Sequence, residues 1–274
     1  MHQQHSVLDD NAVIIWNKHI QSQYYSMGIR SNPLYLNAQP GQFLSVKDMN
    51  RDKPFLRRPF SIHQVIENTN AEVITEILYR VVGTCTENMS HMQAGQSLSV
   101  MGPLGNGFQV SSDMKQSCMV AGGVGIAPLV FLASWLIQNH RQLASGNIFI
   151  GGRSHTDVLC VTELKELGYS VVLTTEDGSM GIQGRITSPF ELFLEQHTPD
   201  MIFACGPIPM LKAVAMIAIK KNIPCQVSLE TVMACGLGAC LGCAVSYQPE
   251  NQTYLHVCRE GAVFNAFELN WDTL

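Results

Sequence analysis

The chain has 274 residues, a formal net charge of −5, 46% hydrophobic residues and 14% charged residues. This composition is typical of a folded globular protein and excludes a disordered or collagen-like chain. The negative charge and the lack of a Lys/Arg run argue against a nucleic-acid partner. The length predicts two domains, with room for a small third one.

The N-terminus and the cysteine content bear on the compartment in which the protein works. The first residues carry no basic stretch followed by an apolar core, so they do not resemble a secretory signal. Nine cysteines without such a signal point to a reducing compartment and to metal or redox chemistry instead of disulfides. We therefore expect a cytoplasmic protein.

The first hundred residues are rich in β-strand signals. Runs of Val, Ile, Leu and aromatic residues are separated by turn residues and predict strands at 13–17, 41–46, 60–66, 72–82 and 96–102. Short strands at this spacing favour a closed antiparallel barrel, which we place at residues 1–108. A brief helix is predicted at 87–92.

After residue 108, short apolar runs alternate with helical stretches. The runs predict strands at 118–123, 147–152, 169–174 and 200–206, and the stretches between and after them predict helices at 127–138, 161–167 and 209–220. This alternation favours an open parallel sheet with helices on both faces, which we place at residues 109–222. Ligands of such sheets bind beyond the carboxyl ends of the strands.

One uncharged stretch, from Gln116 to Asn139, is long enough to cross a bilayer. Gly122, Gly123, Gly125 and Pro128 interrupt its first half. A buried strand, a glycine turn and a buried helix fit this pattern better than a membrane span. We therefore expect no transmembrane segment.

A segment rich in cysteine and glycine, residues 223–274, is expected to form the small third domain. Three of its cysteines have the spacing C-x4-C-x2-C, and a fourth follows further on: Cys235, Cys240, Cys243 and Cys258. This is the plant-type ligand spacing for a [2Fe–2S] cluster. The intervening glycines allow the loop to wrap closely around such a cluster. Structural zinc is the alternative, although zinc sites usually use two C-x2-C pairs and only one is present.

The sequence RRPFSI at 57–62 is a second informative motif. A flavin dinucleotide needs a cation for its pyrophosphate, and a hydroxyl and main-chain groups for its isoalloxazine ring. The motif supplies these groups on one strand, through Arg58, Pro59, Phe60 and Ser61. A plain exposed β-strand explains the same residues equally well.

Two segments of the predicted sheet indicate a dinucleotide. Gly122, Gly123 and Gly125 lie between a predicted strand and a predicted helix, where glycines let the backbone approach phosphate. A structural turn is the alternative, since the third glycine of the G-x-G-x-x-G pattern is missing. Glu176 and Asp177 follow another strand, where an acidic side chain favours NAD over NADP. A solvated turn explains these two carboxylates equally well.

Taken in chain order, these motifs resemble the ferredoxin–NADP reductase superfamily. Besides RPFS, the matching motifs are GPLGNGF at 102–108, AGGVGIAP at 121–128 and CGP at 205–207. With the cysteine motif at the C-terminal end, the chain from about residue 10 onward is similar to the electron-transfer subunits of type-B dihydroorotate dehydrogenases.

The resemblance implies an α+β multidomain fold, with FAD in the barrel, NAD(H) in the α/β domain and a [2Fe–2S] cluster in the C-terminal module. It adds flavin contacts at Leu78, Tyr79 and Arg80. It also implies that Cys205, the cysteine of the CGP motif, lies near the nicotinamide and takes part in catalysis.

A further flavin contact of the family is a Gly-Thr pair. By the resemblance, this pair falls on Cys85 and Thr86, so its glycine is missing in this chain. Gly83-Thr84 is an off-register alternative. The phosphate contact of this loop therefore stays open.

The resemblance also implies a partner, an FMN-containing dihydroorotate dehydrogenase catalytic subunit, in a heterotetramer with two copies of each chain. Electrons then pass from dihydroorotate through FMN, the cluster and FAD to NAD+ in pyrimidine biosynthesis. The alternatives are a small subunit of a ferredoxin–NAD(P) oxidoreductase, a diaphorase subunit of a hydrogenase or sulfite reductase, and a non-enzymatic [2Fe–2S] sensor without FAD.

Overall fold

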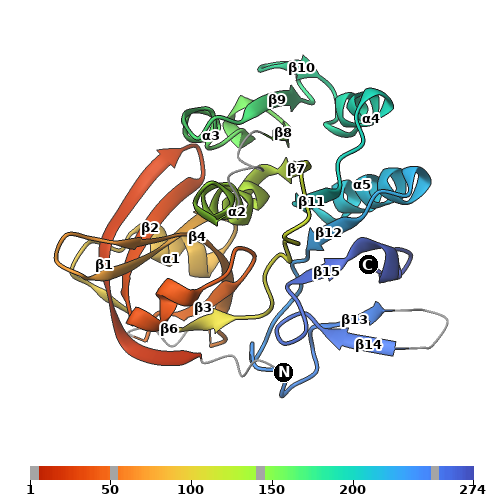
Figure 1. The fold of residues 1–274 in the computed structure, drawn as a ribbon. Coiled ribbons are helices and arrows are strands. Elements are labelled where there is room, and N and C mark those ends of the chain that lie inside the picture. The colour runs from red at the N-terminus through yellow and green to blue at the C-terminus, as the bar shows by residue number, and fades with distance from the viewer. Residues whose placement is uncertain (1–5, 50–54, 140–145, 248–252) are drawn as a thin grey trace. The chain divides into compact units, whose positions relative to one another are not determined.

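The computed structural model describes residues 6–49, 55–139, 146–247 and 253–274 (Figure 1). Its contacts group the chain into two compact units. Unit 1 consists of Met1–Gly107, Glu230–Ala244 and Leu255–Ala262. Unit 2 consists of Phe108–Leu229, Val245–Tyr254 and Val263–Leu274. Each unit is described below by itself.

Unit 1 contains a closed antiparallel β-barrel, as the sequence predicts. Its strands run in the order β1-β2-β5-β4-β3-β6. Their bounds are β1 Val7–Gln21, β2 Tyr24–Ser31, β3 Phe43–Lys47, β4 Arg58–Glu67, β5 Val73–Arg80 and β6 Ser97–Leu104. The 3-10 helix η1 (Pro33–Asn37) links β2 to β3, and the helix α1 (Thr84–Ser90) links β5 to β6.

Seven apolar side chains stabilise the barrel because they are completely buried. They come from every strand of the barrel except β6. They are Ile14, Met27, Ile29, Leu44, Val46, Ile62 and Ile77. Their alternation with more exposed residues in β1 and their burial against one another are what a closed barrel requires. The long strand β1 closes the barrel by pairing with β2 and with β6.

The helix predicted at 87–92 lies instead at Thr84–Ser90, so the predicted start is wrong by three residues. The hydroxyl of Thr86 explains the earlier start. It accepts hydrogen bonds from the main-chain N–H groups of Val82 and Gly83 and donates to the Gly83 carbonyl. These bonds satisfy main-chain groups ahead of the first turn and begin the helix there.

Unit 2 contains a seven-stranded sheet in the order β10-β9-β8-β7-β11-β12-β15. The strands are parallel except for the edge strand β15, which is antiparallel to β12. Their bounds are β7 Ser117–Gly122, β8 Asn147–Gly152, β9 Ser170–Thr175, β10 Ile182–Gln183, β11 Met201–Cys205, β12 Cys225–Ser228 and β15 Val263–Asn265.

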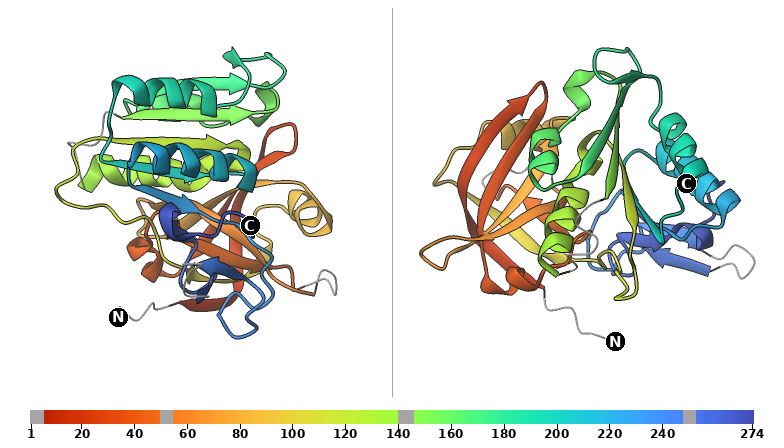
Figure 2. Two further views of the ribbon diagram at one scale, coloured as in Figure 1. Left: turned by 90° about the vertical axis from the view of Figure 1, so that its right-hand side faces the viewer. Right: turned by 45° about the horizontal axis from the view of Figure 1, so that its top comes forward.

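Helices cover both faces of this sheet, which confirms the predicted architecture. Figures 1 and 2 show α2 and α3 on one face and α4 and α5 on the other. Their bounds are α2 Ile126–Asn139, α3 Val161–Glu166, α4 Thr187–Gln196 and α5 Ile208–Lys221. The central strands read as continuous apolar runs because both of their faces are buried.

The uncharged stretch from Gln116 to Asn139 forms β7, the 3-10 turn η2 (Gly123–Gly125) and α2. Its apolar side chains are buried within unit 2, nine of them along α2. In the described part of the chain, no helix is long and apolar enough to cross a membrane.

The last part of the chain is divided between the two units. The strands β12 and β15 belong to the parallel sheet, whereas residues 230–244 and 255–262 belong to unit 1 with the barrel. A two-stranded ribbon of β13 (Ala244–Tyr247) and β14 (Thr253–His256) lies between these segments in the sequence, and η6 (Ala266–Glu268) follows β15. The structure therefore divides into two compact units, whereas the composition predicts three domains. The predicted domain boundaries at residues 108 and 222 stay a prediction.

Candidate functional site

The four cysteines of the predicted cluster motif lie together in unit 1. Cys235, Cys240 and Cys243 lie in the loop between β12 and β13, and Cys258 lies in the turn after β14. The Sγ atoms of Cys243 and Cys258 are 3.3 Å apart. Cys240 hydrogen bonds to Cys235 through both its main chain and its side chain. The donor set therefore consists of two close pairs of thiols, which suits two metal ions bridged within one cluster.

Main-chain N–H groups surround these sulfur atoms. Leu237 and Cys240 each donate to Cys235 Sγ at 3.4 Å, and Gly238 donates to Cys258 Sγ at 3.0 Å. The loop reaches this arrangement because Gly236 and Gly238 adopt φ values of 72° and 76°, which other residues rarely take. Such donors stabilise the negative charge of cluster ligands and adjust the reduction potential of a cluster.

Cys235 and Cys258 differ in their ease of ionisation. Burial raises the pKa of Cys235, but the N–H donors of Leu237 and Cys240 outweigh it and lower this pKa to about 6. Burial raises the pKa of Cys258 to about 12, with a further contribution from the neighbouring Cys243. A bound metal ion supplies the positive charge that Cys258 needs to lose its proton. The surroundings of Cys258 therefore fit a metal ligand better than a free thiol.

The cluster loop packs on the wall of the barrel. A Cβ placed on Gly236 would lie 3.5 Å from Met101 Cε on β6 and 3.6 Å from Ser45 Oγ on β3. In the strand register, Ser45 pairs with Met101 on one side and with Pro59 on the other. The residue next to the proposed ligand Cys235 thus lies close to a strand that is hydrogen-bonded to the RPFS segment.

The predicted flavin strand RPFS is the start of β4. Arg58, Pro59, Phe60 and Ser61 are all half-buried, and they pair with Val46, Ser45, Leu44 and Phe43 of β3. The pairing of β4 with β5 ends at Ile62 and Ile77. In the described barrel, the segments 58–61 and 78–80 therefore have no ladder pairing with each other, and this break in the pairing is called the opening below. Flat polar ring systems require main-chain groups, so this opening fits an isoalloxazine.

Leu78, Tyr79 and Arg80 lie on β5 at this opening. The side chains of Leu78 and Tyr79 are buried, so their main-chain groups are what they can offer to a ligand. The ring of Tyr79 lies edge-on to Phe60 with centroids 6.0 Å apart, and its hydroxyl donates to Asn17 Oδ1. The guanidinium of Arg80 lies over the ring of Tyr24. These contacts give the opening a rigid aromatic border.

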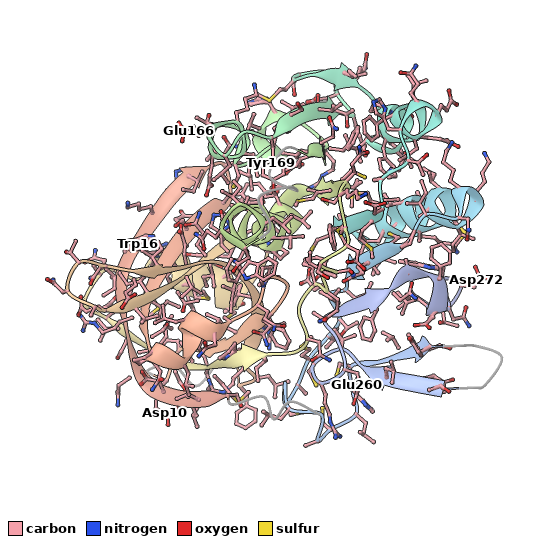
Figure 3. All side chains as sticks on the ribbon, in the orientation of Figure 1. Asp10, Trp16, Glu166, Tyr169, Glu260 and Asp272 are labelled. Atoms are coloured by element: carbon pink, nitrogen blue, oxygen red, sulfur yellow. The ribbon has the colours of Figure 1, made fainter. Side chains whose placement is uncertain are left out.

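The two adjacent arginines of the motif have different surroundings. Arg57 donates to the Ser99 hydroxyl at 2.6 Å and to the Ser99 carbonyl at 3.0 Å, and it lies 3.7 Å from the carboxylate of Asp10, which Figure 3 labels. Within the described residues, Arg58 donates only to the carbonyls of Leu56 and Arg57. Arg57 is therefore committed to the barrel, and Arg58 is the cation available for a pyrophosphate.

Cys85 and Thr86 lie in the first turn of α1. Burial raises the pKa of Cys85, and the nearby Arg58 opposes this effect, so the structure brings this turn into electrostatic range of the flavin strand. The hydroxyl of Thr86 is engaged in starting the helix. A Cβ placed on Gly83 would meet no described atom within 4 Å outside its chain neighbours, so there is open space beside this residue. Its N–H and its carbonyl are bonded to Thr86 and Glu87 at the start of the helix.

The predicted nucleotide residues meet at one edge of the sheet of unit 2. Gly122 ends β7, Cys205 ends β11 and Glu176 follows the end of β9. Because these strands are parallel and belong to one sheet, their carboxyl ends lie along the same edge, where open α/β sheets bind ligands. The position of this edge agrees with a dinucleotide site.

The glycines at this edge also have a packing role. A Cβ on Gly125 would collide with the carbonyl oxygen of Cys205, and one on Gly122 would lie 2.7 Å from Pro207 Cδ. The two loops that follow β7 and β11 therefore approach each other as closely as main chains allow. This approach places the start of α2 beside Cys205, which is itself buried.

The two carboxylates after β9 are not equivalent. Asp177 Oδ1 accepts from the Ser179 hydroxyl at 2.6 Å and from its N–H at 2.9 Å, and these bonds lower the pKa of Asp177. Asp177 therefore stabilises the turn. This agrees with the alternative explanation given above, in which the carboxylates belong to a solvated turn. Glu176 is exposed, and its side chain is the acidic group left to meet a ribose hydroxyl.

Arg153 is a candidate nucleotide contact that sequence reasoning missed. It follows Gly151 and Gly152 at the carboxyl end of β8, and its side chain is 67% exposed. The carbonyl of Arg153 accepts from the N–H of Asp177, and its Nε lies 3.5 Å from Asp157 Oδ2. A cation directly after a Gly-Gly strand end is the signal that could have identified it.

Comparisons with known proteins agree with this geometry. Residues 230–270 match a family model described as the iron-sulfur cluster binding domain of dihydroorotate dehydrogenase B, and residues 119–216 match the oxidoreductase NAD-binding domain. The chain thus carries an iron–sulfur binding segment and an NAD-binding domain.

Two curated relatives match nearly the full chain, and both are named dihydroorotate dehydrogenase B (NAD(+)), electron transfer subunit. The protein of Caldanaerobacter subterraneus subsp. tengcongensis is 40% identical over 94% of this chain and 97% of its own length. The protein of Listeria welshimeri is 33% identical over 96% of this chain and 100% of its own length.

Solved structures show the same fold. A chain of an NADH-dependent reduced ferredoxin-NADP oxidoreductase, studied for flavin-based electron bifurcation, is 26% identical with a TM-score of 0.81, over 96% of this chain and 91% of that one. A ferredoxin NADP+ reductase from Neisseria gonorrhoeae with bound FAD and NADP is 17% identical with a TM-score of 0.64, over 79% of this chain and 92% of that one. The second likeness concerns the fold alone.

Proposed function

Because the chain belongs to the family of the electron transfer subunits of dihydroorotate dehydrogenase B (NAD(+)), we propose that it carries electrons from a dihydroorotate-oxidising FMN subunit to NAD+. It is an oxidoreductase component of pyrimidine biosynthesis, and its cofactors are FAD, a [2Fe–2S] cluster and NAD(H). The flavin, when bound, joins the two-electron chemistry of the nicotinamide to the one-electron chemistry of the cluster.

The observation that carries the proposal is the contact between the cluster loop and the barrel. Gly236, next to the ligand Cys235, packs on Ser45, and Ser45 pairs with Pro59 of the flavin strand. The proposed ligands of the cluster and the proposed flavin residues thus belong to one compact unit, which supports electron transfer between the two cofactors. The protein positions the cofactors, and their own chemistry moves the electrons.

The proposed roles of the individual residues follow from their surroundings. Cys235, Cys240, Cys243 and Cys258 hold the cluster, and the N–H groups around them stabilise its negative charge. Arg58 pairs with the FAD pyrophosphate, and the main chain of 58–61 and 78–80 binds the isoalloxazine ring. Gly122, Gly123 and Gly125 let the nucleotide approach the sheet edge, Glu176 binds its ribose, and Cys205 lies beside the nicotinamide.

The catalytic subunit docks, in our proposal, on the exposed side of the cluster loop. Three apolar side chains of this segment are exposed: Val232 at 86%, Leu237 at 55% and Leu241 at 60%. The ligand Cys240 is exposed between them in the sequence. Exposed apolar groups at this density mark an interaction surface, and contact here brings a partner to the cluster. Charged groups are absent from the loop between Cys235 and Cys243, as expected for a surface that is covered in the complex.

A charge placed on this surface tests the docking proposal. We expect Leu241→Asp to weaken co-purification with the catalytic subunit while the iron content is unchanged. Leu192→Asp is a matched control, because Leu192 on α4 is also 60% exposed and lies in unit 2. Equal retention of the partner by both variants would contradict the proposed surface.

Anaerobic co-purification tests the function itself. We expect an FMN-containing subunit to elute with this chain, in a complex of two copies of each, and the complex to reduce NAD+ when dihydroorotate is added. Turnover of ferredoxin without dependence on dihydroorotate would favour the ferredoxin–NAD(P) oxidoreductase alternative, to which the solved structure at 26% identity is related. Material without flavin absorbance would favour a sensor.

We also propose a cytoplasmic location. None of the nine cysteines forms a disulfide in the structure, although Cys243 and Cys258 lie close together. Cysteines in this number without a disulfide fit a reducing compartment. Fractionation of cells that produce the chain, followed by detection in the cytosolic fraction, tests this location.

A further inference from the structure

The GPLGNGF motif at 102–108 has no role in the function proposed so far. It begins in β6 and ends at the boundary of unit 1. Its central residues, Gly105 and Asn106, contact the segment Arg259–Ala262 of the same unit. That segment directly follows Cys258, the fourth proposed ligand of the cluster. We propose that Asn106 is a positioning residue that fixes the Cys258 turn to the barrel, and with it the cluster.

The turn that carries Cys258 has a compact internal structure. The carbonyl of His256 accepts from the N–H groups of Arg259, Glu260 and Gly261. The carboxylate of Glu260, labelled in Figure 3, accepts from the N–H of His256 at 2.8 Å. These N–H groups of the turn are thus satisfied from within, whereas its last carbonyls need donors from elsewhere.

Asn106 supplies those donors. Its main-chain N–H donates to the carbonyl of Gly261, and its side-chain amide donates to the carbonyl of Glu260 at 2.8 Å and lies 3.5 Å from that of Arg259. Three consecutive carbonyls of the turn therefore converge on one residue of the barrel. Asn106 also forms an isolated β-bridge with Ala262. A side chain without an N–H donor cannot replace the amide contacts.

Gly105 makes this approach possible. It adopts a φ of 72°, and a Cβ on it would lie 2.6 Å from the carbonyl oxygen of Gly261 and 2.9 Å from the nitrogen of Ala262. Its own carbonyl accepts from Gln42 Nε2 at 2.8 Å, which fixes the loop to the barrel on its other side. The glycine and the asparagine of the motif thus serve one contact, between the barrel and the turn.

The consequence for the cluster follows from the position of Cys258 between two supports. On one side Gly238 donates to its sulfur at 3.0 Å and Cys243 Sγ lies 3.3 Å away. On the other side, the next three residues are bonded to Asn106. Groups that orient metal ligands typically change metal affinity about 10- to 100-fold when they are removed. This inference rests on the proposed cluster and assigns to Asn106 the task of holding one of its ligands in place.

The test compares Asn106→Ala with wild type in the complete chain after anaerobic purification. We expect the cluster of the variant to be lost at least about tenfold faster to a chelator, and its EPR signal to broaden or shift, because Cys258 is less firmly held. FAD content and the urea midpoint are expected to stay near the wild-type values. Asn106→Gln keeps the amide donor, and we expect it to recover part of the cluster's lifetime.

Two further variants make the result decisive. Gly105→Ala disturbs the same contact from the neighbouring residue, so it should also shorten the lifetime of the cluster. Asn68→Ala is the matched control, since Asn68 lies in the β4–β5 hairpin and bonds within its own turn. Wild-type cluster lifetime and EPR signal in Asn106→Ala would overturn the inference. Unchanged iron in Cys240→Ser would instead overturn the proposed cluster, so the two failures are distinguishable.

Discussion

The cluster loop of unit 1 and the ligand edge of unit 2 use different parts of the chain for their chemistry. In the cluster loop and the Cys258 turn the candidate reactive groups are side chains, four cysteine sulfurs whose number and spacing restrict the ligand. At the sheet edge the glycines offer main-chain groups, and Gly122 and Gly125 are also required by the packing of two loops. A side-chain motif therefore indicates its ligand directly, whereas a glycine motif has two explanations that only a structure or an experiment separates.

The largest expected effect comes from the side-chain site. Cys240→Ser removes one ligand, and we expect it to lower cluster affinity by at least about 100-fold, since even the hydrogen-bond partners of ligands contribute about 10- to 100-fold. Iron analysis and EPR after anaerobic purification measure this loss. Cys160→Ser, which changes a half-buried cysteine outside the cluster motif, serves as the control. If Cys240→Ser kept its iron, the ligand assignment would be wrong.

A smaller effect is expected at the flavin strand, where two neighbouring cations can be compared. Arg58→Ala should weaken FAD binding by about 10- to 100-fold, because a hydrogen bond to a charged group contributes about 1.5–3 kcal/mol. Arg57→Ala should instead lower the free energy of unfolding, since the Ser99 carbonyl and hydroxyl and the Asp10 carboxylate lose their contacts with the guanidinium. Equilibrium dialysis and urea unfolding separate the two outcomes. Full FAD occupancy of Arg58→Ala after dialysis would argue against the pyrophosphate contact.

Gly125→Ala tests whether the glycine motif serves nucleotide binding or the packing of the loops after β7 and β11. The added methyl collides with the Cys205 carbonyl, and we expect the free energy of unfolding to fall by about 1–3 kcal/mol, as overpacking usually does. Urea unfolding of the chain and the KM for NADH are measured together. A higher KM without any loss of stability would show that the glycine serves the nucleotide and not the packing.

The smallest effect is expected for nucleotide choice. Glu176→Arg replaces an exposed carboxylate by a cation at the end of β9, and we expect the preference for NADH over NADPH to narrow about tenfold. Steady-state kinetics with both nucleotides give the ratio. Asp177→Asn keeps the acceptor for Ser179 and should leave the ratio unchanged. If Glu176→Arg kept the wild-type preference for NADH over NADPH, both carboxylates would have only a structural role in the turn.

Much of the fold follows from local patterns. The barrel and the parallel sheet were predictable because alternating or continuous apolar runs report burial on one face or on two. The strand β2 was missed, although it pairs with β1 and β5 along its length. Its sequence YYSMGIRS mixes buried polar and apolar residues without a clear alternation. The helix α4 was also missed, because Pro189 and few buried residues weaken its signal.

The end of the chain shows where such reasoning stops. The strand β12, with the sequence CQVS, lies in the segment that composition groups with the cluster cysteines, yet it pairs with β11 in the parallel sheet. The contact between Asn106 and the Cys258 turn joins residues more than 150 positions apart. No local pattern carries information about such a contact. The four proposed ligands, in contrast, could be proposed from their spacing alone, and the structure brings them together.

The division of unit 1 among three segments has a consequence for biosynthesis. Its barrel comes from the first 107 residues, whereas the segments that bear the cysteines end at Ala262. A ribosome therefore releases the barrel strands long before the fourth sulfur leaves the exit tunnel. All four proposed ligands are therefore available to iron and sulfide only after most of the chain, including every strand of the parallel sheet except β15, has been synthesised. A chain cut short before residue 230 retains the strands of the barrel but carries none of the groups that receive the metal.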